Sequence, residues 1–202
     1  MRVGMGVIAF LDFEASSLAK KSYPIEVAWV FEDGTEESHL ILPAPGWEDW
    51  DAAAEQIHHI SRATLLTQGI AHDVLARRMV DRLSGHDLSA SAPSWDGKWL
   101  SLLLRAAGLP RHSLRLRDTE DVQRDTACRI LQHCLPRDRL EIEVEKLRSG
   151  AVMTRRARIP AHRALEDARE ERERWIAVRD AAAQFRDVNQ VQKDAKIRKI
   201  LP

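Results

Sequence analysis

Two acidic residues interrupt an apolar segment near the N-terminus. Residues 10–18 read FLDFEASSL, which places Asp12 and Glu14 two positions apart. Residues i and i+2 of a strand project from the same face, so the two carboxylates should converge if this segment is a strand. Neighbouring carboxylates repel each other, and a divalent cation neutralises both. Oxygen ligands of this kind favour Mg²⁺ or Mn²⁺ over zinc.

Asp96 and Asp167 are two further candidate metal ligands. Asp96, in SAPSWDGKW, lies where an expected strand gives way to a helix. It could equally be the N-cap of that helix, where aspartate accepts a hydrogen bond from a backbone N–H. Asp167, in IPAHRALEDARE, lies near the start of a long helix. Taken alone, Asp167 is more simply one acid on a solvated helix face.

His162 is a candidate general base, because the unperturbed pKa of histidine suits proton transfer near neutral pH. On one continuous helix, its spacing of five from Asp167 would turn the two side chains about 140° apart. Pro160, however, indicates that the helix begins only after His162. The histidine then lies on the preceding loop, and Asp167 points inward from the first helical turn.

Three motifs now carry a family resemblance. In chain order, DFEASSL, WDGKW and HRALEDA resemble the exonuclease motifs of the DEDDh group of 3′–5′ exonucleases, over residues 7–175. That group includes proofreading subunits of DNA polymerases, ribonuclease T and oligoribonuclease. The third motif, H-x-A-L-x-D-A, is the most specific. Ser17 stands where a glycine is frequent, and Ala92 and Pro93 stand where many relatives have His-Asn.

The resemblance implies a two-metal phosphodiester hydrolysis. Two Mg²⁺ or Mn²⁺ ions would be held by four residues: Asp12, Glu14, Asp96 and Asp167. His162 would deprotonate the attacking water, and the 3′ oxygen of the next nucleotide would leave, which gives a nucleoside 5′-monophosphate. Ala15 and Ser16 would offer backbone groups to the terminal nucleotide.

An arginine-rich segment precedes the third motif. Residues 154–164 contain no Asp or Glu and four arginines: Arg155, Arg156, Arg158 and Arg163. Arginine binds phosphate with a forked geometry, so these residues are candidate contacts to a nucleic-acid backbone. A solvated basic loop is an equally simple interpretation. Trp47, Trp50 and Trp95 are candidates to stack on a base, but core packing is the favoured interpretation for Trp95, and Trp47 and Trp50 are the more open candidates.

The elements that must position these residues follow from hydrophobic spacing. Three strands are expected at 7–13, 25–32 and 38–42, as an antiparallel meander with a DG hairpin turn. Helices are expected at 49–58, 61–67, 73–83, 97–107, 121–135, 137–147 and 163–185, with further strands at 88–92 and 113–117.

This order predicts an α/β fold in which helices flank both faces of a five-stranded mixed sheet. The family resemblance implies the same three-layer, ribonuclease-H-like arrangement, with the first three strands antiparallel. We expect residues 1–185 to form the exonuclease domain. Residues 186–202 form a C-terminal tail that either docks as a last helix or stays mobile.

The composition limits the choice of partner and compartment. The 202 residues include 31 Lys plus Arg and 31 Asp plus Glu, which excludes a uniformly basic coat for nucleic acid but not a local basic patch. No membrane span or signal peptide is expected. Cys128 and Cys134 lack a metal-site pattern, so we expect reduced thiols and a cytoplasmic protein.

The leading hypothesis is a metal-dependent 3′–5′ exonuclease that acts on the 3′ end of single-stranded nucleic acid. One alternative is a catalytically weak binding or regulatory module on the same fold, which the altered residues before Asp96 would suit. Another is a polymerase-associated proofreading subunit that docks through its tail. The choice between RNA and DNA depends on contacts to the 2′-OH and stays open, and the resemblance also allows a homodimer.

Overall fold

The computed structural model describes residues 6–153 and 162–200. The chain divides into two compact units. The first comprises Met1–Asp118 and Pro160–Arg172, and the second comprises Thr119–Ile159 and Glu173–Pro202. The candidate site residues named above that the structure describes all fall in the first unit.

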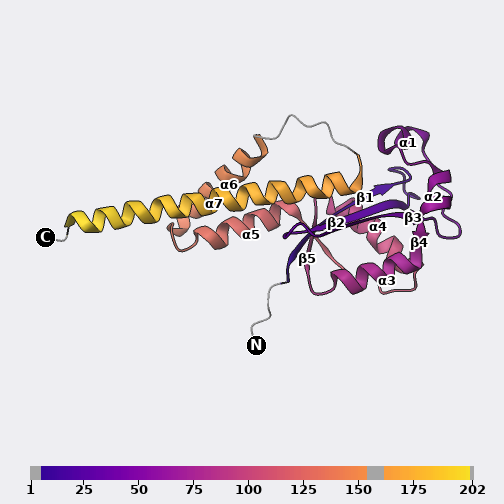
Figure 1. Ribbon diagram of the computed structural model, residues 1–202, viewed down its shortest axis with the longest axis horizontal. Helices are drawn as coiled ribbons and strands as arrows, with labels where there is room; N and C mark the ends of the chain where they lie inside the picture. Colours follow the sequence, from indigo (N-terminus) through magenta and orange to yellow (C-terminus); the bar gives the residue numbers. More distant parts are fainter. Residues whose placement is uncertain (1–5, 154–161, 201–202) are drawn as a thin grey trace. The chain divides into compact units, whose positions relative to one another are not determined.

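A six-stranded mixed sheet is the centre of the first unit, in the order β4-β3-β2-β1-β5-β6. Figure 1 labels strands β1 to β5 of this sheet. The strands are β1 Ile8–Ala15, β2 Pro24–Phe31, β3 Glu36–Leu42, β4 Ile70–Ala71, β5 Asp87–Ala90 and β6 Leu116–Asp118. Strands β1, β2 and β3 pair antiparallel, while β5 and β6 run parallel to β1. The predicted antiparallel meander and mixed sheet are therefore confirmed.

The sixth strand, β4, is the one that the sequence pattern did not predict. Its two residues pair with the end of β3, Ile41 opposite Ile70 and Leu42 opposite Ala71. A Cβ atom at Gly69 would lie 2.5 Å from the Leu42 nitrogen, so glycine is what lets the chain approach β3 this closely. Two residues show no detectable period, which explains why this strand was missed.

The alternation of β1 separates a core face from a site face. Its residues Ala9, Leu11, Phe13 and Ala15 join the main hydrophobic core. Helices α3 His72–Leu83 and α4 Pro93–Ala106 contribute Leu75, Met79, Leu100 and Leu103 to the same core. Asp12 and Glu14 project from the opposite face, where the first turns of helix α7 Ala164–Ile200 lie.

Each of the seven predicted helices is confirmed, with shifted ends. Helices α1 Ala52–His58 and α2 Arg62–Gln68 begin at side-chain caps, where Asp51 accepts from the Ala53 N–H and Ser61 from the Thr64 N–H. Helix α4 begins at Pro93 rather than at residue 97, because proline suits the first helical position. Strand β6 begins at Leu116 rather than at residue 113, because residues 110–113 close a turn.

The second unit is helical. Helices α5 Thr119–Leu131 and α6 Arg137–Met153 pack with the later part of α7. Their core contains Ala127, Leu131, Val144, Val178 and Ala182. Both cysteines are free and partly buried, as expected. Helix α7 was predicted to end at residue 185 but continues to Ile200, because no Gly or Pro interrupts residues 186–200.

Among the helices that the structure describes, we find none with the length and apolar character that a membrane crossing requires.

Candidate metal centre

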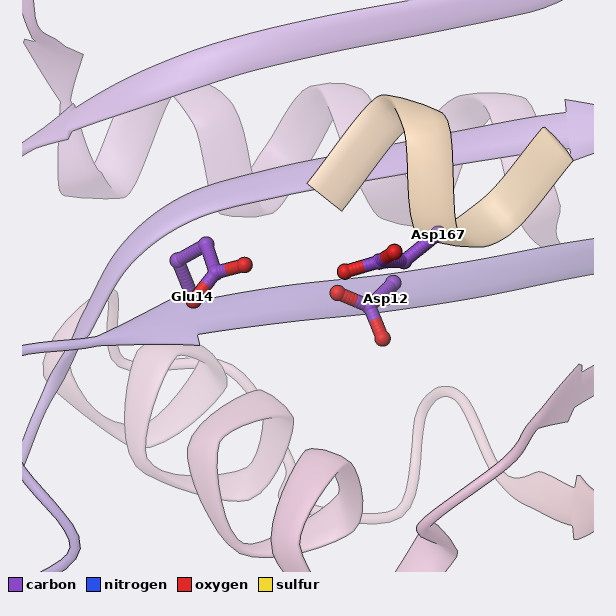
Figure 2. A group of neighbouring side chains, drawn as sticks. All are labelled: Asp12, Glu14 and Asp167. Atoms are coloured by element: carbon purple, nitrogen blue, oxygen red, sulfur yellow. The ribbon is translucent and has the colours of Figure 1, made fainter. Parts of the chain in front are cut away.

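Three carboxylates from two distant segments meet on the site face of the sheet. Asp12 and Glu14 extend from β1, and Asp167 extends from the first turn of α7. Each contributes an oxygen to a group whose atoms all lie within 4.8 Å of one another. Figure 2 shows Asp12 and Asp167 side by side, with Glu14 further along the same strand. Oxygen-only ligands at this spacing suit Mg²⁺ or Mn²⁺.

Burial and mutual repulsion raise the pKa values of the clustered carboxyls. Burial raises the pKa of the Asp12 carboxyl well above its ordinary value, and the charges of Asp96, Glu14 and Asp167 raise it further. Burial, followed by the charges of Asp167 and Glu26, raises the pKa of Glu14 to about 8, although Arg163 opposes this shift. Without a cation, Glu14 therefore holds its proton near neutral pH. A divalent ion can displace that proton, so ion binding and proton release are coupled.

Asp96 adds a fourth carboxylate, although it is not one of the three within 4.8 Å. It lies in the first turn of α4, where it is only 2% exposed. Ala92 is the N-cap of that helix and makes no side-chain cap bond, so the N-cap alternative for Asp96 was wrong.

The carboxyl of Asp96 has one oxygen available to a ligand. Burial raises its pKa to about 7, partly offset by hydrogen bonds with the backbone of Phe13 and Ala92. Its Oδ2 atom is buried and finds no hydrogen-bond partner in the described parts of the chain. The charge of Asp96 also raises the pKa of both Asp12 and Glu14, so its carboxylate lies near theirs. A buried oxygen without a hydrogen-bond partner at this place fits a cation site.

His162 lies outside α7, as Pro160 predicted. The helix begins at Ala164, and the Asp167 N–H donates to the Arg163 carbonyl at 3.1 Å. His162 is exposed and has a left-handed φ of 49°, a conformation that histidine adopts more readily than most residues. It therefore precedes the helix as a solvent-accessible imidazole, five residues before Asp167 in the chain.

Arg163 has a partner inside the protein. Its Nε and Nη2 atoms donate to the two oxygens of Glu26, at 3.1 and 2.7 Å. Of the four arginines proposed to contact phosphates, Arg155, Arg156 and Arg158 lie outside the described residues.

Ser16 and Ser17 secure the loop after β1. The backbone N–H of Ser16 donates to the Tyr23 carbonyl, and its own carbonyl accepts from the Asp51 N–H. Both serine hydroxyls donate to the same Asp49 oxygen, at 3.1 Å from Ser16 and 2.5 Å from Ser17. The hydroxyl of Ser17 therefore anchors Asp49. Ala15 ends β1 with its side chain in the core.

We expect Asp49→Ala to lower the free energy of unfolding by about 1–3 kcal/mol, because the hydroxyls of Ser16 and Ser17 would lose their acceptor. Urea unfolding followed by tryptophan fluorescence measures the change. Glu48→Ala removes an exposed neighbouring carboxylate and should stay within about 0.5 kcal/mol of the unmodified protein. Equal effects of the two substitutions would contradict the anchoring role of Asp49.

The three candidate stacking tryptophans differ in their surroundings. Trp47 stacks on Tyr23 at 5.2 Å between ring centroids, and Trp50 donates its Nε1–H to Glu55. Trp95 packs against Trp99 at 5.6 Å but remains 39% exposed. Trp95 therefore combines an accessible ring with a position directly before Asp96.

Glu171 is a neighbour of the site that the sequence motifs did not indicate. It follows Asp167 by four residues on α7 and is buried. Its charge raises the pKa of both Asp12 and Asp96. Its i, i+4 spacing to Asp167 could have indicated that Glu171 faces the site, because residues at this spacing share a helix face.

Comparison with known proteins gives structural matches only. No protein-family model matches the chain, and no curated protein matches it in sequence. A zinc-bound E. coli ExoI–ssDNA complex aligns with a TM-score of 0.60 at 16% identity, covering 87% of this chain and 40% of that chain. E. coli exonuclease I in complex with a dT13 oligonucleotide aligns with a TM-score of 0.50 at 17% identity, covering 63% and 30%.

A product-bound exonuclease I structure gives a similar match, with a TM-score of 0.51 at 17% identity over 63% of this chain and 32% of that chain. The chain spans well under half the length of these solved chains. At such identities the similarity concerns the fold alone. The protein therefore has the mixed α/β, ribonuclease-H-like fold found in exonucleases, with helices flanking a mixed sheet, as its sequence predicted.

Proposed function

We propose that this protein is a metal-dependent 3′–5′ exonuclease of the DEDDh type, which releases nucleoside 5′-monophosphates from single-stranded nucleic acid. The observation that carries the proposal is the meeting of Asp12, Glu14 and Asp167, with ligand oxygens within 4.8 Å of one another. It occurs on a fold shared with exonuclease I, whose solved structures include complexes with ssDNA and with dT13.

The residues of the cluster fit a pair of Mg²⁺ or Mn²⁺ ions. Asp12, whose pKa responds to four other carboxylates, is the proposed shared ligand. Glu14, Asp167 and the orphaned Oδ2 of Asp96 complete the set. When bound, two such ions would stabilise the charge on the attacking and leaving oxygens of an in-line displacement at phosphorus.

His162 is the proposed general base. Its exposed position before α7 leaves the imidazole able to accept a proton from a water molecule and pass it to solvent. Trp95 is the proposed stacking surface, and the arginines at 155, 156 and 158 remain proposed phosphate contacts. We keep residues 1–185 as the proposed exonuclease domain and the cytoplasm as its proposed location.

The decisive experiment follows mononucleotide release from oligonucleotides labelled at the 3′ or the 5′ end, with RNA and DNA in parallel and with Mg²⁺ or Mn²⁺. We expect release of the 3′ label as a 5′-mononucleotide, and none in EDTA. Binding of the oligonucleotide without any release would instead support the alternative of a regulatory module.

We expect His162→Asn to slow nucleotide release by about 10²–10⁴-fold, the usual contribution of general base catalysis. Asparagine tolerates the left-handed backbone, so the substitution should remove the base without refolding the loop. His59→Asn is the matched control, because His59 is also exposed and has a φ of 58°. Wild-type rates for His162→Asn would refute the assignment of the base.

A further inference from the structure

Glu26 is a buried carboxylate placed directly beside the site. It lies on β2, opposite Glu14 in the antiparallel register of β1 and β2, and is 2% exposed. Side chains of directly opposite residues project from the same face of a sheet. Glu26 therefore belongs to the site face, next to the candidate metal ligands.

One carboxylate accepts three hydrogen bonds from the start of α7. Arg163 reaches both oxygens of Glu26 in a forked ion pair, at 3.1 and 2.7 Å. The Ala164 N–H donates to Oε2 at 3.1 Å. The first N–H groups of a helix lack partners within the helix, and a negative charge there is favourable. Glu26 thus caps α7 from a strand that is 137 residues distant from Arg163 in the chain.

Arg163 and Ala164, the two residues that donate to Glu26, lie between His162 and Asp167 in the chain. His162 precedes Arg163 directly. Asp167 is fixed relative to Arg163, because the Asp167 N–H donates to the Arg163 carbonyl. On the strand side, the pairing of β1 with β2 ties Glu26 to Asp12 and Glu14. A shift at Arg163 or Ala164 would therefore move His162 and Asp167 relative to the β1 carboxylates.

We propose that the ion pair of Glu26 with Arg163, together with the Ala164 hydrogen bond, is the positioning device that sets His162 and Asp167 against Asp12 and Glu14. This inference rests on the proposed function and adds Glu26 to it as a positioning residue. Arg163 then acts through Glu26 rather than through a substrate phosphate, and the two roles have different kinetic consequences.

Glu26→Gln and Arg163→Lys test this contact of Glu26 with Arg163 and Ala164, which we call the clamp. Lysine keeps the positive charge that attracts phosphate but cannot form a fork with a carboxylate. A small misplacement of catalytic groups can cost about 10²-fold, so we expect each variant to lower kcat by about 10- to 10²-fold, with an almost unchanged KM for the oligonucleotide. We expect the double variant to be no slower than the slower single variant, because both substitutions break the same contact.

Arg169→Lys is the matched control. Arg169 also lies on α7 and forms a forked ion pair with a strand residue, Glu36, one to two turns beyond the clamp. This pair is more exposed and does not involve the start of the helix. Arg169→Lys should leave kcat and KM unchanged.

Hydrogen exchange supplies a reading that does not depend on activity. Hydrogen bonds to a charged acceptor are about twice as strong as neutral ones, so the Ala164 amide should exchange about tenfold faster in Glu26→Gln and at the wild-type rate in Arg169→Lys. A raised KM with normal kcat in Arg163→Lys, or normal kcat and exchange in Glu26→Gln, overturns the proposal. An inactive wild type would refute the proposed function, while the exchange result would still decide the clamp.

Discussion

We expect Asp12→Asn to lower the rate of 3′-nucleotide release by at least about 10³-fold, because metal ions contribute several kcal/mol to such reactions and each 1.4 kcal/mol is tenfold in rate. Asp12 is the residue whose pKa responds to the charges of Asp96, Glu14, Asp167 and Glu171. Asparagine keeps the shape but removes the charge from the centre of the group. Single-turnover release in saturating Mn²⁺ measures the loss.

The same variant should also bind Mn²⁺ more weakly, which calorimetric titration can follow without substrate. Asp33→Asn is the control, because Asp33 is an exposed acid in the turn between β2 and β3. It should keep wild-type activity and metal affinity. Activity above about one tenth of wild type in Asp12→Asn would rule out its proposed role as a shared ligand, since tenfold corresponds to only about 1.4 kcal/mol.

The metal-free protein is expected to lose stability as pH rises from about 5 to 9. The pKa of Glu14 is about 8 in the fold against an ordinary 4.5, and that of Asp96 is about 7 against 3.8. Between these values the folded chain holds more protons than the unfolded chain, so the free energy of unfolding falls with rising pH. Stability from these groups is complete below their ordinary pKa values and is lost as pH passes their raised ones.

A divalent ion should reverse this trend, because it binds the deprotonated ligands of the folded state. Thermal unfolding in EDTA and in Mn²⁺, at pH 5, 7 and 9, measures both effects. The melting temperature in EDTA should fall toward pH 9, and the rise produced by Mn²⁺ should be largest there. An equal rise at pH 5 and pH 9 would contradict the coupling of metal binding to proton release.

Glu14→Gln isolates the contribution of one group. At pH 9 in EDTA it should stabilise the protein by at least about 1 kcal/mol, or about 2–4 °C in melting temperature for a chain of this size. At pH 5 Glu14 is protonated in the fold, so the variant should melt near the wild-type temperature. The same substitution should weaken Mn²⁺ binding, which would show that this site favours function over stability.

Local sequence pattern predicted much of the fold because its signals act over a few residues. The period of two in β1 placed Asp12 and Glu14 on one face, and Pro160 placed His162 before α7. The ends of elements were less predictable, because they depend on particular caps and turns. Helix α4 begins at Pro93, so Asp96 lies in the first turn rather than at the N-cap, which the sequence pattern also allowed.

The sequence by itself determined the order of the helices and of every strand except β4, and it placed Asp12 and Glu14 on one face of β1, because these features depend on short-range spacing. The tertiary structure alone decided the pairing of β4 with β3, the burial of Glu171 beside Asp12, and the contact of Glu26 with Arg163. That last contact joins residues 137 positions apart, so no local period could indicate it. Only the packing of the first turn of α7 against the sheet brings Asp167 close enough to Asp12 and Glu14 for the three carboxylates to share a cation.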